Sequence, residues 1–517
     1  MTKNNTISTW IATGGIIALL FILFGIAINP NFAINEDLGR HIKLGEIIWQ
    51  TQSVPTTNLF TYTNPDFPFL NHHWLAEVFF YSLNQYAGLE IISLIKITVI
   101  VIAVLLVFSL ANNIAGFLPA LFSATILAPI MMTRANERPE IFGFLFFALL
   151  LLILYGKEKP SKKYLTMIPF ILLIWINAHL SFIYGVFLFS IFLLKNIWLF
   201  SKKLIQKDDI IFYFSIFITS VLALFVNPNG IRAMLYPFGI FQNYGYMIIE
   251  NQDVFFLLTR IGNKLIPYFL IVAPIIIIAI IYTMFLNTKN KKNYHFPLTT
   301  HYKLQTTNYT SPTTHYSLVF IALIFAILSF LALRNFPFFV LSAIPAFAIA
   351  LKIISEKYLK KWRKYIPTAV LSLIVVNLVF AIFLYRQPMF NFGIAENYKN
   401  GVDFFLTNNL PGNIFNNFDI GGYLDYRLYP QYKTFVDNRP EAFPQDFFEK
   451  YRQIQTDPKI RRAEFQKYNI NSIIFSINDI TPWAQEFLKQ IVQDPEWQTI
   501  YLDNAMIILI KKKTLAI

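Results

Sequence analysis

The chain has 517 residues, of which 56% are hydrophobic and only 14% are charged. A soluble protein of average composition carries about a quarter charged residues, so composition excludes an ordinary soluble enzyme. The chain contains no cysteine, which excludes disulfides and thiolate metal sites. The formal net charge of +14 raises the question of nucleic-acid binding, which the distribution of the basic residues answers below.

Apolar runs of about 20 residues recur along most of the chain, and each is long enough to cross a bilayer. The first run follows a short basic start and is too long for a typical signal-peptide core, so we expect it to be retained. The sequence predicts an α-helical polytopic membrane protein with about eleven spans, at residues 9–29, 89–110, 114–131, 141–156, 164–177, 180–196, 210–227, 265–287, 317–333, 337–354 and 365–385.

Clusters of lysine and arginine set the expected orientation. They lie at residues 157–163, 195–207, 289–303 and 352–364. With eleven spans, all four clusters and Lys3 fall on one face, which the positive-inside rule makes cytoplasmic. We therefore expect a plasma (inner) membrane protein with a cytoplasmic N-terminus. The net charge then reflects topology and argues against a nucleic-acid partner.

The tail of the chain is far more polar than the rest. Its alternation of helix-like and strand-like segments predicts an extracytoplasmic α/β domain at 387–517, after a transmembrane domain at 1–386. The expected helices lie at 396–409, 443–455 and 483–493, and the expected strands at 433–438, 472–477, 497–502 and 505–511.

The loop 30–88, on the same outer face, carries an acidic pair and two amphipathic stretches. Residues 37–50 and 73–86 are typical of helices that lie in the membrane interface. The pair Glu36 and Asp37 begins the first of them, where a carboxylate can act on a lipid-carried substrate. Asp37 can equally serve as the helix N-cap, and the two roles are compatible.

Three histidines on the outer face are candidate ligands. His72 and His73 precede the second amphipathic stretch, and adjacent histidines on a helix make a poor bidentate metal site by themselves. One of them could join Asp37 around a divalent metal ion or hydrogen-bond a phosphate, or both could be interfacial polar side chains. His179 lies at an outer turn, as a ligand or as a satisfied turn residue. The metal requirement stays open.

Arginines on the outer face are candidate phosphate ligands, because guanidinium groups stay charged and bind phosphate bidentately. Arg134 and Arg138 stand just outside a span, where they could instead pair with the nearby Glu137 and Glu140. Arg334 has no acidic neighbour in the sequence and is a freer candidate.

Other polar residues are weaker candidates for a functional site. Glu250 and Asp253 form a second outer acidic pair, which could bind an acceptor or a metal, although a solvated loop face is the favoured interpretation. Lys96 lies inside a span near its outer end, where its side chain could reach the interface. No acidic residue lies in the middle of a span, which argues against an ion-coupled transporter. In the tail, Asp437 and Arg439 stand at the end of a predicted strand and could reach the membrane-side site.

The arrangement resembles the GT-C superfamily of integral-membrane glycosyltransferases, which includes protein O-mannosyltransferases and lipid A aminoarabinose transferases. The resemblance rests on the acidic pair in the first outer loop and on the two helices of that loop, and it covers about residues 10–340. A narrower, largely uncharacterised bacterial branch is similar over the whole chain, through strings such as Asp37-Leu-Gly-Arg-His41, Asn71-His-His-Trp74 and Phe435-Val-Asp437.

The resemblance implies a transferase that moves a sugar from a polyprenyl-phosphate donor to a glycan, lipid or protein acceptor on the extracytoplasmic face. Asp37, beside Glu36, would be the general base, and Arg134, Arg138 and Arg334 would hold the leaving lipid phosphate, with inversion at the anomeric carbon. Membrane lipids are expected partners, and a divalent metal ion is a candidate cofactor. The alternatives are a transporter or flippase of lipid-linked substrates and a non-catalytic membrane assembly protein.

Overall fold

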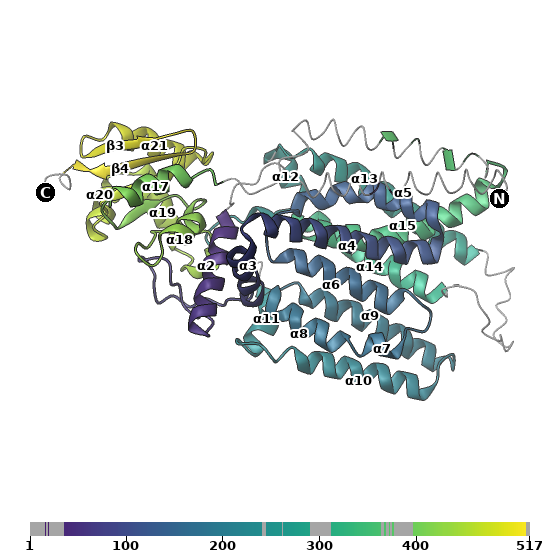
Figure 1. Cartoon of the computed structure of the whole chain (residues 1–517). Coiled ribbons are helices and arrows are strands. Elements are labelled where there is room, and N and C mark those ends of the chain that lie inside the picture. The colour runs from purple at the N-terminus through teal and green to yellow at the C-terminus, as the bar shows by residue number, and fades with distance from the viewer. Residues whose placement is uncertain are drawn as a thin grey trace.

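The computed structural model describes residues 36–239, 244–260, 262–289, 312–362 and 396–512, together with a few isolated positions. The expected span at 9–29 and most of the span at 365–385 lie outside the described residues. Within them, the chain forms a long helical bundle with a small α/β unit at one end, and helices α2 and α3 lie between the two (Figure 1).

Each of the nine expected spans between residues 89 and 354 corresponds to helical structure. The helices are α4 (Glu90–Ala115), α5 (Phe117–Leu127) with the 3-10 helix η1 (Ala128–Arg134), α6 (Glu140–Tyr155), α7 (Lys162–Leu165), α8 (Ile168–Ala178), α9 (Phe182–Ser201), α10 (Lys207–Ala223), α13 (Leu265–Lys289), α14 (Pro312–Leu331) and α15 (Phe336–Tyr358). Six helical segments of the described chain are long and apolar enough to cross a membrane. The protein is therefore a multi-span membrane protein, and the count of eleven stays a prediction.

Helix α15 is the centre of the bundle. Every residue from Phe336 to Ala350 is buried, and a helix that is apolar on all sides belongs in an interior. The ring of Phe338 packs against Phe144, Phe147 and Tyr184 from α6 and α9. Helices α10 and α13 instead keep large apolar side chains exposed, as expected of surfaces that face lipid.

The charge inside α4 is buried, contrary to the expectation that it reaches the interface. The Lys96 side chain is fully buried, and its Nζ lies 2.7 Å from Oε1 of Glu137. Ser93 donates a further hydrogen bond to the same oxygen at 2.8 Å. The sequence left open an ion pair of Glu137 with Arg134 or Arg138, but Glu137 pairs with Lys96 instead, because a lysine in apolar surroundings needs a counter-charge.

The first outer loop forms the two expected helices, α2 (Glu36–Thr51) and α3 (Trp74–Ala87). The two helices cross closely at Gly45. A Cβ atom added at this position would lie only 2.0 Å from the backbone oxygen of Glu77, so the crossing requires glycine. Shorter helices cover the same end of the bundle: α11 (Ile231–Gly239), η2 (Ile249–Asn251), α12 (Val254–Arg260) and η4 (Leu333–Asn335), while η5 (Lys360–Trp362) follows α15.

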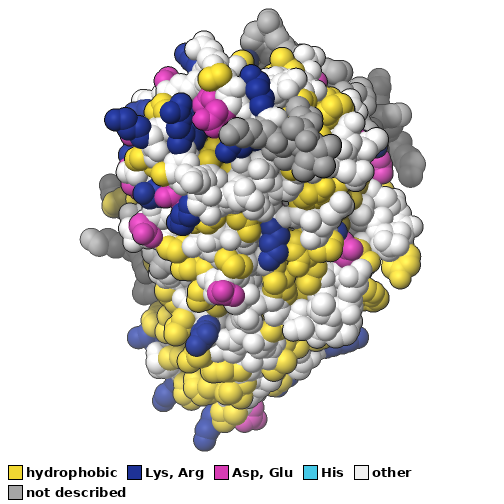
Figure 2. Space-filling view, turned by 90° about the vertical axis from the view of Figure 1, so that its left-hand side faces the viewer, with side chains coloured by type: hydrophobic (Ala, Val, Ile, Leu, Met, Phe, Trp, Pro, Cys, Tyr) yellow, Lys and Arg dark blue, Asp and Glu magenta, His cyan; other side chains and the backbone are white. Residues whose placement is uncertain are grey.

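The C-terminal unit is a four-stranded sheet with helices. Its elements are α17 (Lys399–Thr407), β1 (Ile414–Asn416), α18 (Gly421–Leu428), η6 (Pro440–Ala442), α19 (Phe447–Thr456), α20 (Pro458–Lys467), β2 (Ser472–Ser476), α21 (Pro482–Gln493), β3 (Trp497–Leu502) and β4 (Met506–Lys511). The strand order is β1-β2-β4-β3, with β1 and β2 parallel and the other neighbours antiparallel. Both basic and acidic side chains are spread over the end of the molecule seen in Figure 2.

The prediction of a strand at 433–438 is wrong. This segment has one isolated bridge, between Thr434 and Thr61, and otherwise runs as a loop against the first outer loop. Its amides find partners outside a sheet: Thr434 donates to the oxygen of Phe60 in that loop at 3.1 Å, and Phe435 donates to the side chain of Asn416 in β1 at 2.9 Å. Because these partners come from distant segments, local sequence could not indicate them.

Candidate active site

A cavity of about 310 Å³ lies where the bundle, helix α2 and the C-terminal unit meet. Its walls come from the start of α2, the residues before α3, the end of η1 with the turn that follows it, the turn between α8 and α9, residues 244–250, and the C-terminal unit. It brings together Asp37 and all six side chains that the sequence indicated as substrate ligands: His72, His73, Arg134, Arg138, His179 and Arg334. The side chain of Glu36 lies outside the described part of the chain.

The carboxylate of Asp37 is held on both oxygens. Arg40 approaches Oδ1 at 3.0 Å, and Asn438 of the C-terminal unit donates to the same oxygen at 2.6 Å. Arg138 contacts Oδ2 at 2.7 Å. Asp37 therefore stands in the cavity wall as a paired carboxylate.

Glu250 lies in this cavity and not on a solvated loop face. It pairs with Arg138 and, at 2.7 Å, with Arg134. Burial by itself would raise the pKa of Glu250, but Arg138, Arg134 and Arg334 outweigh burial and hold the pKa well below its ordinary value. Asp253 has a separate role, because it accepts the amides that begin α12.

The arginines are thus both cavity ligands and ion-pair partners. Arg134 also forms an ion pair with Glu140 at 2.7 Å, which is one of the pairings that the sequence left open. The tertiary fold brings four guanidinium groups to the cavity from separate segments. They belong to Arg40 of the first outer loop, Arg134 of η1, Arg138 of the turn after η1, and Arg334 of η4. Such a group of arginines beside a few carboxylates suits a phosphate-bearing ligand.

The wall contributed by the C-terminal unit carries two further carboxyl groups, Asp419 and Glu441. Burial, followed by the charge of Asp479, raises the pKa of Asp419 to about 7. Burial also raises the pKa of Glu441, and Arg40 opposes the rise. Sequence patterns had not singled out either residue.

His73 belongs to a group that could hold a metal ion, but this group does not include Asp37. One ligand atom from each of His41, His73 and Glu77 lies within 4.8 Å of the others. Nδ1 of His41 is 2.8 Å from Oε1 of Glu77, and Asn71 donates to Oε2 at 2.5 Å. Imidazole and carboxylate are ligands that Zn²⁺ accepts, so the donor set fits a divalent transition metal.

The other two histidines extend this cluster along the cavity. The rings of His72 and His73 lie 3.8 Å apart, and those of His73 and His179 lie 5.2 Å apart. Burial lowers the pKa of His72 to about 4, so its imidazole is neutral near pH 7. A neutral imidazole has one donor nitrogen and one acceptor nitrogen for a polar ligand. Sequence reasoning had found these histidines but missed His41.

No protein-family model and no curated protein matches the chain. Solved structures do match. The archaeal oligosaccharyltransferase AglB of Archaeoglobus fulgidus, in complex with an inhibitory peptide and a dolichol-phosphate, aligns at 12% identity with a TM-score of 0.56, over 90% of this chain and 69% of that one. The same enzyme in complex with Zn and sulfate aligns at 11% identity with a TM-score of 0.53, over 90% and 68%.

The match extends to a second enzyme. ArnT of Cupriavidus metallidurans, bound to undecaprenyl phosphate, aligns at 11% identity with a TM-score of 0.50, over 97% of this chain and 98% of that chain. Both enzymes are GT-C membrane glycosyltransferases, so the chain has the GT-C fold, as the sequence resemblance implied.

Proposed function

We propose that this protein is a membrane glycosyltransferase that moves a sugar from a polyprenyl-phosphate donor to a glycan, lipid or protein acceptor on the extracytoplasmic face. The observation that carries the proposal is the cavity in which Asp37 and the arginines Arg134, Arg138 and Arg334 meet. The orientation that the positive-inside rule predicts for eleven spans supports an outward-facing cavity.

In this proposal Asp37 accepts the proton of the acceptor hydroxyl. The hydroxyl oxygen bonds to the anomeric carbon as the bond from that carbon to the phosphate oxygen breaks, and the configuration inverts. The leaving group is the polyprenyl phosphate, whose added negative charge the arginines stabilise. A positioned base contributes on the order of a hundred- to ten-thousand-fold in rate, and donors aimed at developing charge contribute a comparable factor.

Arg138 links these two tasks. It contacts Oδ2 of Asp37 and also pairs with Glu250. A donor phosphate within its reach is a further anionic partner for the same guanidinium. We propose that donor binding draws Arg138 from Asp37 and so frees Oδ2 for the acceptor hydroxyl. The base would then become available only when a donor is bound, which would disfavour wasteful chemistry.

The ligands of the structural neighbours support a lipid-linked substrate. AglB is in complex with a dolichol-phosphate and ArnT is bound to undecaprenyl phosphate, and both ligands are polyprenyl phosphates. Another structure of the archaeal enzyme contains Zn. For this chain we propose His41, His73 and Glu77 as the residues that would hold a divalent metal ion. A bound metal would add positive charge to the cavity wall, and the proton transfer is assigned to Asp37 alone.

The test is glycosyl transfer by the purified full chain in lipid, with a panel of polyprenyl-phosphate sugars and hydroxyl acceptors. We expect Asp37→Asn to lower turnover at least a hundred-fold, because the amide cannot take the proton. Asp66→Asn is the matched control, since Asp66 lies exposed in the same loop, and it should keep wild-type turnover. Equal turnover in Asp37→Asn and wild type would remove Asp37 from the mechanism. Donor movement across sealed vesicles without transfer would favour the flippase alternative.

A further inference from the structure

We propose that Asn438 is a positioning residue for Asp37, so that the C-terminal unit completes the site with a side chain of its own. The inference rests on the proposed function, because it takes Asp37 as the reacting carboxylate. The sequence had suggested Asp437 and Arg439 as the residues of this segment that reach the site. The side chains of Asp437 and Arg439 are both fully buried. Asn438, which lies between them and is half-buried, lines the cavity.

Asn438 closes a three-membered ring of polar contacts. Its Nδ2 donates to Oδ1 of Asp37 at 2.6 Å, and its Oδ1 accepts from Nε of Arg40 at 3.2 Å. Arg40 completes the ring with its Nη2 at 3.0 Å from the same oxygen of Asp37. The amide can satisfy both partners in one orientation only, because a flipped amide would turn its oxygen toward the carboxylate and its NH₂ toward the guanidinium. The ring therefore fixes the direction of the carboxylate.

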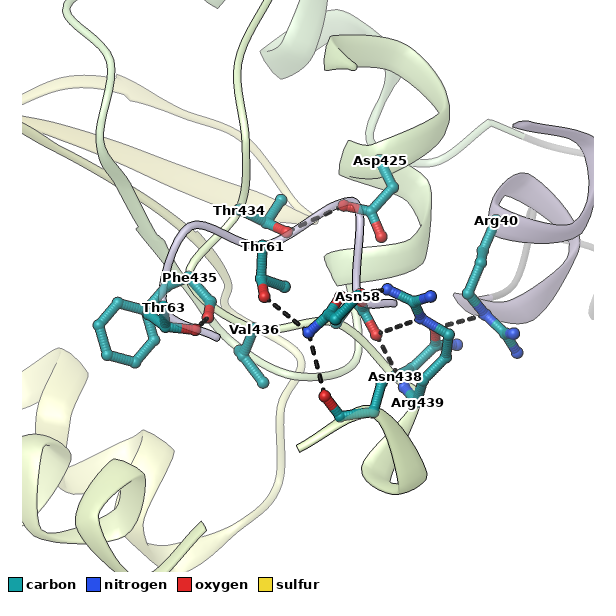
Figure 3. Close-up of polar contacts among 12 residues, drawn as sticks. Arg40, Asn58, Thr61, Thr63, Asp425, Thr434, Phe435, Val436, Asn438 and Arg439 are labelled. Carbon is teal, nitrogen blue, oxygen red and sulfur yellow. Dashed lines mark hydrogen bonds and ion pairs between the residues drawn. The ribbon is translucent and has the colours of Figure 1, made fainter. Parts of the chain in front are cut away.

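The backbone on either side of Asn438 is held firmly. Arg439 donates through Nη2 to Asp437 at 2.5 Å and to Asn58 of the first outer loop at 2.6 Å. Its guanidinium also lies 4.9 Å from the ring centre of Phe60. Figure 3 shows Arg439 beside Asn58, and Asn438 between them and Arg40. Asn438 is thus carried by a loop that is fastened to the same outer loop that carries Asp37.

A second anchor comes from helix α18. A Cβ added at Gly421 would lie 2.5 Å from the oxygen of Val436 and 2.6 Å from Cα of Asp437, so only glycine allows the helix to lie this close. Gly421 is therefore required by the close packing of α18 against the loop that carries Asn438. Helix α18 also packs against α2, so the loop that carries Asn438 and the helix that carries Asp37 share a support.

The placement leaves Oδ2 as the reacting oxygen of Asp37. With Oδ1 committed to Asn438 and Arg40, Oδ2 is the oxygen left for Arg138 and the acceptor hydroxyl. Asn438 thus sets the direction in which the proposed base faces, which a residue that merely docks the C-terminal unit would not do.

The experiment measures Asp37 directly and does not depend on turnover. The purified full chain is treated at one fixed pH with a carbodiimide and an amine nucleophile, and the rate of Asp37 modification is measured by mass spectrometry. A carbodiimide adds to a carboxyl oxygen, so removal of the amide that covers Oδ1 should make Asp37 react faster. We expect Asn438→Ala to raise the rate of modification about ten-fold, the equivalent of one hydrogen bond to a charged group. Asn478→Ala is the matched control, because Asn478 makes an exposed amide contact in the same unit, with Asn504.

An unchanged rate of Asp37 modification in Asn438→Ala, or the same increase in Asn478→Ala, would overturn the positioning role. Turnover then tests the link to catalysis: Asn438→Ala should lower kcat about ten- to a hundred-fold and leave the donor KM within about three-fold. If the wild type shows no transfer but Asn438→Ala is modified faster, the proposed function is contradicted and the contact between Asn438 and Asp37 is supported. A normal kcat in Asn438→Ala would contradict the importance of this contact for catalysis.

Discussion

The guanidinium of Arg138 lies 2.7 Å from Oδ2 of Asp37 and also pairs with Glu250. One cation is thus shared between the proposed base and a second carboxylate of the same cavity. This sharing distinguishes Arg138 from Arg134, whose ion pairs go to Glu140 and Glu250. Arg138 is therefore the arginine through which phosphate binding would act on Asp37.

From this we predict that Arg138→Gln lowers turnover about a hundred- to a thousand-fold, the usual cost of removing one donor to developing charge. Arg138→Lys should restore little, because a lysine cannot contact two carboxylates in the planar geometry of a guanidinium. The measurement is steady-state transfer with the donor found for the wild type. Recovery of more than about a third of wild-type turnover in Arg138→Lys would refute a role that depends on the planar guanidinium group of Arg138.

The sequence was most informative where chemistry depends on local pattern. Apolar runs long enough for a membrane predicted the bundle helices, and amphipathic spacing predicted α2 and α3. Asp37 and the arginines stood out because they lie just outside apolar runs. The predicted membrane topology put these segments on one face, and in the structure they meet around one cavity.

Partners across the fold could not be predicted in the same way. Glu250 was expected in solvent because its neighbours in sequence are polar, yet it pairs with arginines of another segment. Lys96 was expected at the interface because it lies near the outer end of its span, but it pairs with Glu137, which lies beyond η1. The role of Asn438 could not be predicted from the sequence, because a single asparagine in a loop matches no motif. Its role depends on its contacts with Asp37 and Arg40.

The pair of Lys96 and Glu137 gives a prediction about stability. Lys96→Met leaves Glu137 buried without its counter-charge, so we expect the free energy of unfolding to fall by about 3–5 kcal/mol. The double variant Lys96→Met/Glu137→Leu removes both charges and should recover most of that loss. Thermal unfolding in a single detergent measures both variants beside wild type. A double variant no more stable than Lys96→Met would contradict the compensation.

The cluster of His41, His73 and Glu77 predicts metal binding. We expect the full chain, purified without chelator and dialysed against Zn²⁺, to retain about one equivalent by elemental analysis, and His73→Gln to retain much less. His315→Gln is the matched control, since His315 lies in α14 and outside the cluster, and its metal content should equal that of wild type. Equal metal in His73→Gln and wild type would exclude this cluster as the ligand set.

Asp419 predicts a dependence of stability on pH. Burial and Asp479 raise its pKa from an ordinary value of 3.8 to about 7. Below about pH 4 the group is protonated in both the folded and the unfolded chain. Between about pH 4 and 7 the unfolded chain loses the proton first, so the stability contributed by the raised pKa is lost as pH rises, and the loss is complete above about 7.

Asp419→Asn removes this ionisation and keeps the shape of the side chain. We therefore expect the variant to gain stability relative to wild type by about 1–3 kcal/mol between pH 5 and pH 8, at about 1.4 kcal/mol per pH unit at most. Thermal unfolding of both proteins at several pH values measures the difference, with the exposed Asp446→Asn as control. A difference that is constant across this range would mean that Asp419 ionises in the folded protein as it does in the unfolded chain, and its wall of the cavity would then be open to water.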